Sequence, residues 1–218
     1  MRILITGANG LVGQGVLQEC LRDAEVTEIV ALGRHPSGQS HRKLGELICP
    51  DFSRLRAVEE KLQPFDACLY CAGAPPIGTS EIEYRHVTQE LTENVARTMA
   101  RHNPGMTFVY VSGAHANAQS RLMPLRVKGE TEEALAALPI RTVMLRPGGI
   151  QPVEGVRSPH AAMDALYTLA GPLMGWGVRL LPDTITTTQR VGRAMLAVLQ
   201  QPDAPAVLEN RDINRLGA

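Results

Sequence analysis

The residues best suited to chemistry begin with a glycine-rich run close to the N-terminus. Gly7, Gly10 and Gly13 recur at every third position, directly after a short apolar run and at the start of a helical pattern. In this setting the first glycine makes a tight turn, the second lets the backbone approach a pyrophosphate, and the third lets the helix pack on the sheet. The N-terminus of that helix favours a bound anion. The spacing therefore predicts a dinucleotide-binding loop. The residues assigned to it are Gly7, Asn9, Gly10, Leu11, Val12 and Gly13.

A cation follows the second expected strand, where many dinucleotide sites carry an acid. That strand ends in Gly33-Arg34. An Asp or Glu at this place binds the ribose 2′-hydroxyl of NAD, whereas an arginine suits the 2′-phosphate of NADP. We therefore expect NADP(H) as the cofactor, with NAD(H) less favoured. Asp51 and Phe52 follow the third expected strand, where such sites border the adenine, although a loop cap is an equally simple role for Asp51.

Short apolar runs alternate with helical patterns along the chain. Strands are expected over 2–6, 28–32, 47–49, 67–71, 107–112 and 141–145, and helices over 11–22, 81–101, 122–138 and about 188–200. Alternating strands and helices need crossover connections, so the pattern predicts an α/β fold with a Rossmann-type doubly wound parallel sheet in the order 3-2-1-4-5-6. We expect one domain over 1–218. Prolines punctuate the later chain, where we expect 148–187 to form a small substrate-side cover.

Composition argues against several other classes of protein. Lys plus Arg (22) equals Asp plus Glu (22), so we expect no nucleic-acid partner. The most apolar late stretch, 161–181, is broken by Asp164, Pro172 and Arg179, so we expect no integral membrane segment. The chain begins in an expected strand without a signal-peptide pattern, which predicts a cytoplasmic location.

The cysteines and the missing catalytic motifs exclude further chemistry. Cys68-Leu-Tyr-Cys71 spells C-x-x-C, but it lies in an expected buried strand, where positions i and i+3 point to opposite faces. We therefore expect packed thiols there, and neither a disulfide nor a metal site. The sequence contains no Ser-His-Asp order, no G-x-S-x-G elbow and no His-rich metal spacing, so hydrolysis and metal catalysis are not expected.

Further motifs at the ends of the later strands resemble one family. They are Ala72-Gly73, Val111-Ser112-Gly113, Arg126-Val-Lys-Gly-Glu130 and Arg146-Pro-Gly148. Together with the TGANGLVG start, they resemble the atypical short-chain dehydrogenase/reductases. The resemblance is greatest to the small NAD(P)-binding, epimerase-like bacterial proteins related to the Tat-interacting tumour-suppressor oxidoreductase of animals.

The resemblance implies a role for each of these motifs. Ala72-Gly73 would line the ribose side of the cofactor. Ser112 would stand beside the nicotinamide, and Lys128 would hydrogen-bond the nicotinamide ribose. Pro147-Gly148 would carry the backbone past the carboxamide.

One position departs from the family pattern. Reductases and epimerases of this family use Tyr-x-x-x-Lys, in which the lysine and the cofactor lower the tyrosine pKa so that it exchanges a proton with the substrate. Four residues before Lys128 stands Pro124, which has no ionisable group. Ser112, Lys128 and His115 are then the catalytic candidates, with His115 or Tyr167 as the substitute proton donor.

Two functions follow from this departure. The first is an NADP(H)-dependent oxidoreductase or epimerase-like enzyme that acts on a small carbonyl or sugar-like substrate. The second is a non-catalytic regulator that senses NADPH and acts through a protein partner.

Overall fold

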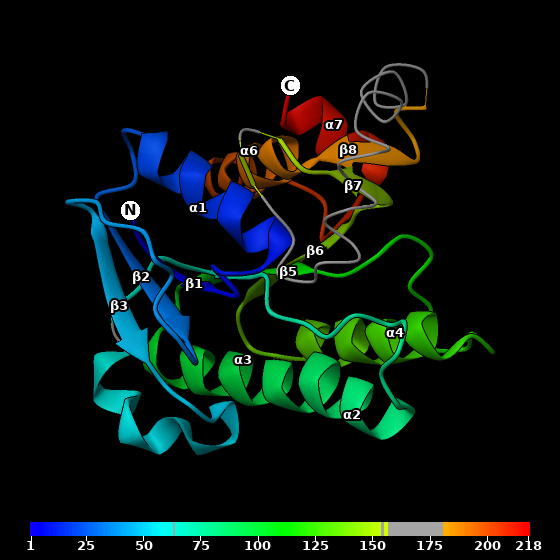
Figure 1. Ribbon diagram of the computed structural model, residues 1–218, viewed down its shortest axis with the longest axis horizontal. Helices are drawn as coiled ribbons and strands as arrows, with labels where there is room; N and C mark the ends of the chain where they lie inside the picture. The colour runs from blue at the N-terminus through cyan, green and yellow to red at the C-terminus, as the bar shows by residue number, and fades with distance from the viewer. Residues whose placement is uncertain (63, 154, 157–180) are drawn as a thin grey trace.

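A seven-stranded parallel sheet forms the centre of the molecule (Figure 1). The computed structural model describes residues 1–62, 64–153, 155–156 and 181–218. The strands of the sheet are β1 (Arg2–Thr6), β2 (Glu28–Gly33), β3 (Leu44–Ile48), β4 (Ala67–Tyr70), β5 (Thr107–Val111), β6 (Arg141–Arg146) and β9 (Val207–Glu209). Their spatial order is β3-β2-β1-β4-β5-β6-β9, with every neighbouring pair parallel. The predicted doubly wound order is confirmed, and β9 extends it at one edge.

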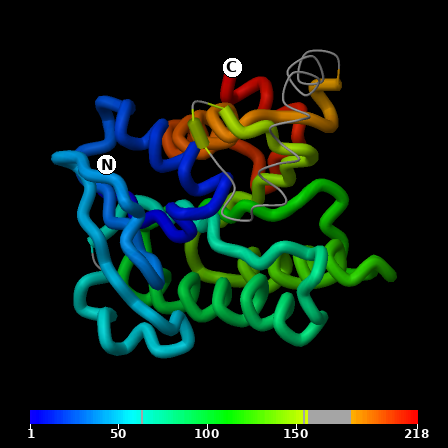
Figure 2. Tube along the Cα trace, in the orientation of Figure 1, coloured from blue at the N-terminus to red at the C-terminus, as the bar shows by residue number. Residues whose placement is uncertain are grey.

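Helices cover both faces of this sheet. They are α1 (Leu11–Arg22), α2 (Glu81–Arg85), the π-helical turn η3 (His86–Glu90), α3 (Leu91–His102), α4 (Met123–Ala136), α6 (Thr188–Gln200) and α7 (Asn210–Leu216), with 3-10 turns η1 (Phe52–Ala57) and η2 (Glu59–Lys61). Helices α1 and α6 lie side by side on one face, although they are far apart in sequence (Figure 1 and Figure 2). Helices α3 and α4 lie on the other face.

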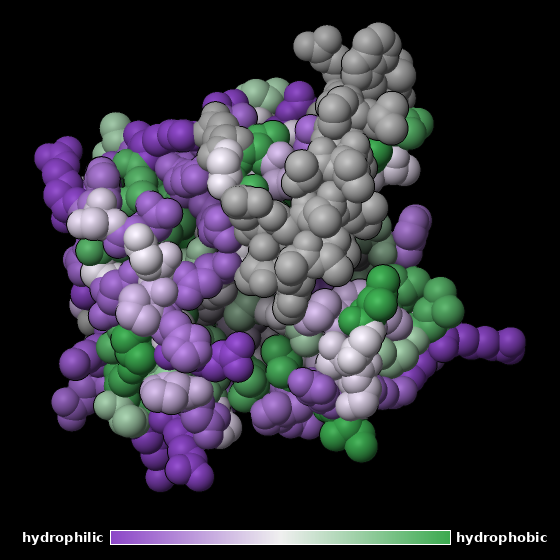
Figure 3. Space-filling view, viewed as in Figure 1, coloured by the Kyte–Doolittle hydropathy of each residue, from purple (hydrophilic) through white to green (hydrophobic). Residues whose placement is uncertain are grey.

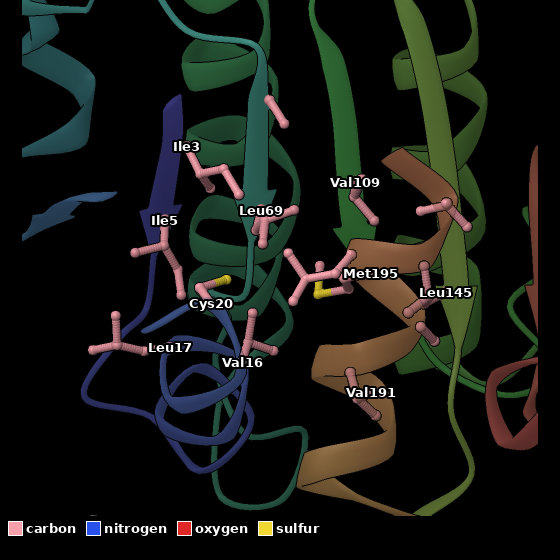
Figure 4. Close-up of a cluster of buried hydrophobic side chains, with 14 of the residues drawn as sticks. Ile3, Ile5, Val16, Leu17, Cys20, Leu69, Val109, Leu145, Val191 and Met195 are labelled. Carbon is pink, nitrogen blue, oxygen red and sulfur yellow. The ribbon is translucent and has the colours of Figure 1, made fainter. Parts of the chain in front are cut away.

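The alternation of side chains along each strand divides the core in two. Ile3 and Ile5 of β1 join a cluster with residues of α1 and α6, whereas Leu4 joins a second cluster with residues of α3. Figure 4 shows the first cluster, in which Val16 of α1 and Met195 of α6 pack near the strands. Strands buried on both faces carry apolar residues without alternation, as the sequence of β1 does.

The C-x-x-C cysteines follow the same rule. Cys68 lies in the second cluster, and Cys71 packs against the first. The four cysteines of the chain are free. The prediction that Cys68 and Cys71 point to opposite faces is confirmed.

Several elements differ from those expected. Strand β3 begins three residues earlier than predicted and ends at Ile48. The expected helix over 81–101 runs to His102 and contains the π-helical turn η3. After β6, two short strands, β7 (Gly149–Gln151) and β8 (Ile185–Thr187), form a separate parallel pair. Of the expected cover over 148–187, residues 154 and 157–180 lie outside the described residues.

Candidate cofactor-binding site

The carboxyl ends of the parallel strands meet along one edge of the sheet, and a cleft opens there. Its volume is about 510 Å³. The predicted residues that line it are Gly7, Asn9, Gly10, Arg34, Asp51, Phe52, Ala72 and Gly73. Sequence positions from four separate loops are thus brought together, as expected for a ligand site at the switch point of such a sheet. The other predicted residues lie outside this lining, and Leu11, Val12 and Gly13 belong to the first turn of α1.

The glycine loop has no room for side chains at Gly7 and Gly13. Gly7 has a φ of 68°, and a Cβ built on it would lie 2.6 Å from the backbone nitrogen of Ala72. A Cβ on Gly13 would lie 2.0 Å from the carbonyl oxygen of Gly7. The lack of a side chain at Gly13 therefore lets the first turn of α1 approach the backbone directly after β1.

The N-terminus of α1 is left free for an anion. Its N-cap is Gly10, which has no side chain to accept from the first turn, and that turn carries no acidic residue. The first N–H groups of a helix have no acceptor within the helix, and together with the positive end of the helix dipole they favour a negatively charged ligand. A pyrophosphate therefore fits the residues that are present.

The loop after β2 is tied to the glycine loop. The Asn9 Nδ2 donates to the carbonyl oxygen of Pro36 at 2.9 Å and to that of His35 at 3.4 Å. Arg34 is exposed at the cleft, and no hydrogen bond or ion pair of its guanidinium is seen within the described ranges. Asn9 thus positions the loop that carries Arg34.

Asp51 has the capping role that the sequence also allowed. Its carboxylate accepts from the backbone N–H of Ser53 at 2.8 Å and caps η1. Hydrogen bonding from Ser53 holds the pKa of Asp51 below its usual value. Phe52 is buried in the second cluster while it lines the cleft.

Three polar residues of the cleft were not singled out from the sequence. They are Ser37, Glu46 and His86. The His86 Nδ1 lies 2.7 Å from a carboxylate oxygen of Glu90, one helical turn away. Glu46 belongs to β3, and Ser37 to the loop after β2. No local motif marks these residues, because the folding of the chain alone brings them to the cleft.

Ser112 directly follows β5, and Lys128 of α4 reaches the end of that strand. Ser112 is 5% exposed, and its Oγ has no hydrogen-bond partner. The Lys128 Nζ donates to the carbonyl oxygen of Val111 at 3.2 Å and lies 5.2 Å from the centre of the Tyr110 ring. Burial lowers the pKa of Lys128 to about 8, partly opposed by the carboxylate of Glu132.

Backbone contacts hold Pro147 and Gly148 at the same edge. The carbonyl oxygen of Pro147 accepts from the backbone N–H of Ala114 at 2.9 Å. The Gly148 N–H donates to Asn210 Oδ1 at 2.9 Å, and a Cβ on Gly148 would lie 2.2 Å from the Thr184 oxygen. The segment after β6 is therefore packed against the loop that follows Ser112.

The two substitute proton donors stand differently. His115 is exposed in a tight turn with a φ of 62°, and it lies outside the cleft lining. Tyr167 lies outside the described residues. Pro124 occupies the first turn of α4, where its missing N–H costs no helical hydrogen bond, one turn before Lys128.

The tyrosines of the described ranges are buried in the core. Tyr70, Tyr84 and Tyr110 are each 1% exposed, and burial raises the pKa of all three hydroxyls. None of these three therefore has the lowered pKa that the family's catalytic tyrosine needs.

A family model matches most of the chain, including the glycine loop. The model describes the NAD dependent epimerase/dehydratase family and matches residues 3–142. The chain belongs to the NAD dependent epimerase/dehydratase family. This membership agrees with the resemblance to dehydrogenase/reductases at the level of the larger family, and with the cleft as a dinucleotide site.

Individual proteins that match this chain are only distantly similar to it in sequence. The mitochondrial protein fmp52 of Aspergillus fumigatus is 31% identical over 78% of this chain and 75% of that protein. The leucinostatins biosynthesis cluster protein T of Purpureocillium lilacinum is 28% identical over all of this chain and 89% of that protein. UDP-glucuronic acid 4-epimerase from Bacillus cereus, solved in complex with NAD, matches with a TM-score of 0.68 and 18% identity over 92% of this chain and 73% of that one. This likeness confirms the α/β fold.

Large apolar side chains are exposed on one part of the surface. Figure 3 shows apolar side chains gathered near the starts of α2 and α4, where Ile82 and Leu122 are 84% and 64% exposed. Within the described part of the chain, no helix is long and apolar enough to cross a bilayer, and no group of three or more His, Cys, Asp or Glu side chains is placed to hold a metal ion. Because a relative is named mitochondrial, the cytoplasmic location stays a prediction.

Proposed function

We propose that this chain is an NADP(H)-preferring oxidoreductase or epimerase-like enzyme that acts on a small carbonyl or sugar-like substrate. The observation that carries the proposal is the pairing of Lys128 Nζ with the Val111 carbonyl oxygen beside the unpartnered Ser112 Oγ, at the edge of the sheet that holds the cofactor cleft. The nicotinamide, when bound, supplies hydride transfer.

Ser112 is suited to bind a reacting oxygen. A buried hydroxyl without a partner costs roughly 1–3 kcal/mol, and a substrate oxygen beside it would remove that cost. Ser112 then donates to the substrate carbonyl or hydroxyl and orients it toward the nicotinamide.

Lys128 takes the proton-transfer role that Pro124 leaves unfilled. A general acid works best when its pKa lies near the operating pH, and the Lys128 pKa of about 8 meets that condition. The absence of tyrosine at position 124 is therefore compatible with catalysis. His115 is the second candidate for the proton, and its exposed turn makes it less suited.

Arg34 is proposed to favour NADP(H) over NAD(H). A charge-assisted contact with the 2′-phosphate is worth roughly 1.5–3 kcal/mol, and each ~1.4 kcal/mol is tenfold in affinity. NADPH should then bind about ten to a hundred times more tightly than NADH.

The short motifs at 126–130 and 146–148 lead us to place the chain near the small proteins related to the Tat-interacting oxidoreductase.

The test separates binding from chemistry. NADPH and NADH are titrated by nicotinamide fluorescence, and turnover is measured with a panel of aldehydes, ketones and nucleotide sugars. Ser112→Ala and Lys128→Met should lower kcat by roughly 10²–10⁴-fold while NADPH still binds. His115→Phe should have little effect, and the exposed Lys61→Met serves as the matched control.

Each other outcome has a definite reading. Failure of both nucleotides to bind refutes the proposal. Turnover that survives both substitutions refutes the roles of Ser112 and Lys128. Tight NADPH binding without turnover over the whole panel favours the regulator that acts through a protein partner.

A further inference from the structure

Two opposite charges line the cofactor cleft. Arg34 follows β2, and Glu46 lies on the neighbouring strand β3, where it pairs in register with Ala31. Both side chains are exposed at the cleft. Arg34 favours an anion there, whereas Glu46 repels one.

Glu46 accepts hydrogen bonds from the loop after β2, which carries Arg34. Its Oε1 accepts from the backbone N–H of Ser37 at 3.0 Å and also from the Ser37 hydroxyl. The backbone N–H of Gln39 donates to the Ser37 Oγ at 3.3 Å. A backbone N–H and a hydroxyl beside an arginine are the groups that a phosphate binds, and in this cleft a carboxylate already accepts from both.

The same carboxylate suits a ribose that lacks the 2′-phosphate. Ribose hydroxyl groups are donors, and an ionised carboxylate has acceptor capacity beyond its two bonds from Ser37. NAD(H) therefore meets an acceptor at Glu46, while NADP(H) meets a cation at Arg34 and a repelling charge at Glu46.

We infer that Glu46 is a specificity-determining residue. Its negative charge opposes the effect of Arg34, so the ratio of NADP(H) affinity to NAD(H) affinity is smaller than Arg34 alone would give. The inference rests on the proposed dinucleotide function. A charge-assisted contact changes affinity by roughly ten- to a hundredfold. Because Glu46 is exposed and its field is screened by salt, the effect falls at the lower end, about tenfold.

Isothermal titration calorimetry of adenosine fragments tests this inference. The ligands are adenosine 2′,5′-bisphosphate and adenosine 5′-monophosphate, which differ by the 2′-phosphate alone, together with NADPH and NADH. Glu46→Gln removes the charge but keeps an oxygen that accepts from Ser37, so the loop keeps its anchor. This variant should bind the bisphosphate about tenfold more tightly relative to the monophosphate, with a smaller gain at high salt.

Two control variants keep the result specific. Glu46→Asp retains the charge and should leave the ratio of the two affinities near that of the wild type. Glu60→Gln makes the same change of charge at an exposed position outside the cleft and should also leave it unchanged. An equal ratio in wild type and Glu46→Gln, with both fragments bound, overturns the role of Glu46. Failure of the wild-type chain to bind any of the four ligands overturns the proposed function itself.

Discussion

Lys128 is half-buried, and its ammonium group lies over the ring of Tyr110 and donates to the Val111 carbonyl oxygen. Desolvation disfavours the charged form and lowers its pKa from the ordinary 10.5 to about 8. Below pH 8 the lysine is charged in the folded and the unfolded chain, so folding carries the whole desolvation cost. Between about pH 8 and 10.5 the unfolded chain binds more protons, and stability rises with pH.

Lys128→Met should therefore stabilise the fold at pH 7, because it removes a charge that folding must desolvate. The advantage over the wild type should shrink by pH 10, where the folded wild type has already lost the proton. Urea unfolding of both proteins at pH 7 and pH 10 measures the difference in free energy. The exposed Lys61→Met should show no such pH dependence. A difference that stays constant between the two pH values would mean that Lys128 is not desolvated.

Helices α1 and α6 approach each other through glycines. A Cβ on Gly15 would lie 2.5 Å from the Cβ of Thr188, and one on Gly192 would lie 3.1 Å from the Cα of Val16. The close approach lets Val16 and Leu17 pack with Val191 and the rest of the first cluster (Figure 4). The two helices therefore act as one layer over the sheet.

Gly15→Ala sets two effects against each other. Alanine gains about 1 kcal/mol of helix propensity over glycine, but overpacking at a tight contact costs typically 1–3 kcal/mol. We expect the packing term to win and the free energy of unfolding to fall by about 1–2 kcal/mol, measured by urea denaturation. Gly105→Ala, whose Cβ would have no neighbour within 4 Å, is the control. A more stable Gly15→Ala protein would show that the helices separate at little cost.

The elements that could be predicted are those with strong local signals. Helix α1 and strand β1 have the bounds expected, because apolar periodicity and the glycine loop mark them. Strand β3 was placed too late, since this edge strand has exposed Gly45 and Glu46 between its apolar residues. A π-helical turn adds one residue to an otherwise helical pattern, so the apolar periodicity does not reveal it. Strands β7, β8 and β9 have three residues each, which is too short for a local pattern to mark them.

The candidate site could also be predicted only where the signal lies within one short segment of the sequence. The glycine loop and Arg34 follow from spacing within one βαβ unit. The bonds of Glu46 to Ser37 depend on the register of β3 against β2, which no local pattern fixes. The roles of Asn210 beside Gly148 and of Asn9 beside Pro36 likewise depend on contacts between distant segments.

At the scale of the whole molecule, α7 joins the small sheet to the large one. Asn214 accepts from the buried Thr186 hydroxyl at 2.8 Å and donates to the carbonyl oxygens of Pro182 at 2.7 Å and Ile185 at 2.8 Å. Asn210, one turn earlier, donates to the same Pro182 oxygen. Two amides on one helix face thus anchor the segment that follows the undescribed residues.

Asn214→Ala should lower the free energy of unfolding by about 2 kcal/mol. Loss of the amide leaves the buried Thr186 hydroxyl and the partly buried Ile185 carbonyl without this partner, whereas the exposed Pro182 oxygen keeps its bond from Asn210. An unsatisfied buried group costs roughly 1–3 kcal/mol. Thermal and urea denaturation both report this loss. The matched Asn117→Ala, at an exposed loop position, should cost about 1 kcal/mol or less. Equal losses at the two positions would contradict the anchoring role of Asn214.

The strand order also has a consequence for the growing chain on the ribosome. Strand β1 lies between β2 and β4, and β4 is synthesised about 35 residues after β2 ends. At an elongation rate of about 5–20 residues per second, one side of β1 stays unpaired for roughly 2–7 seconds until β4 is synthesised. During that time the unpaired N–H and C=O groups on that side are open to pairing with another nascent chain. Slow codons between 34 and 66 would lengthen this interval, so the yield of folded protein should depend on translation speed over that segment.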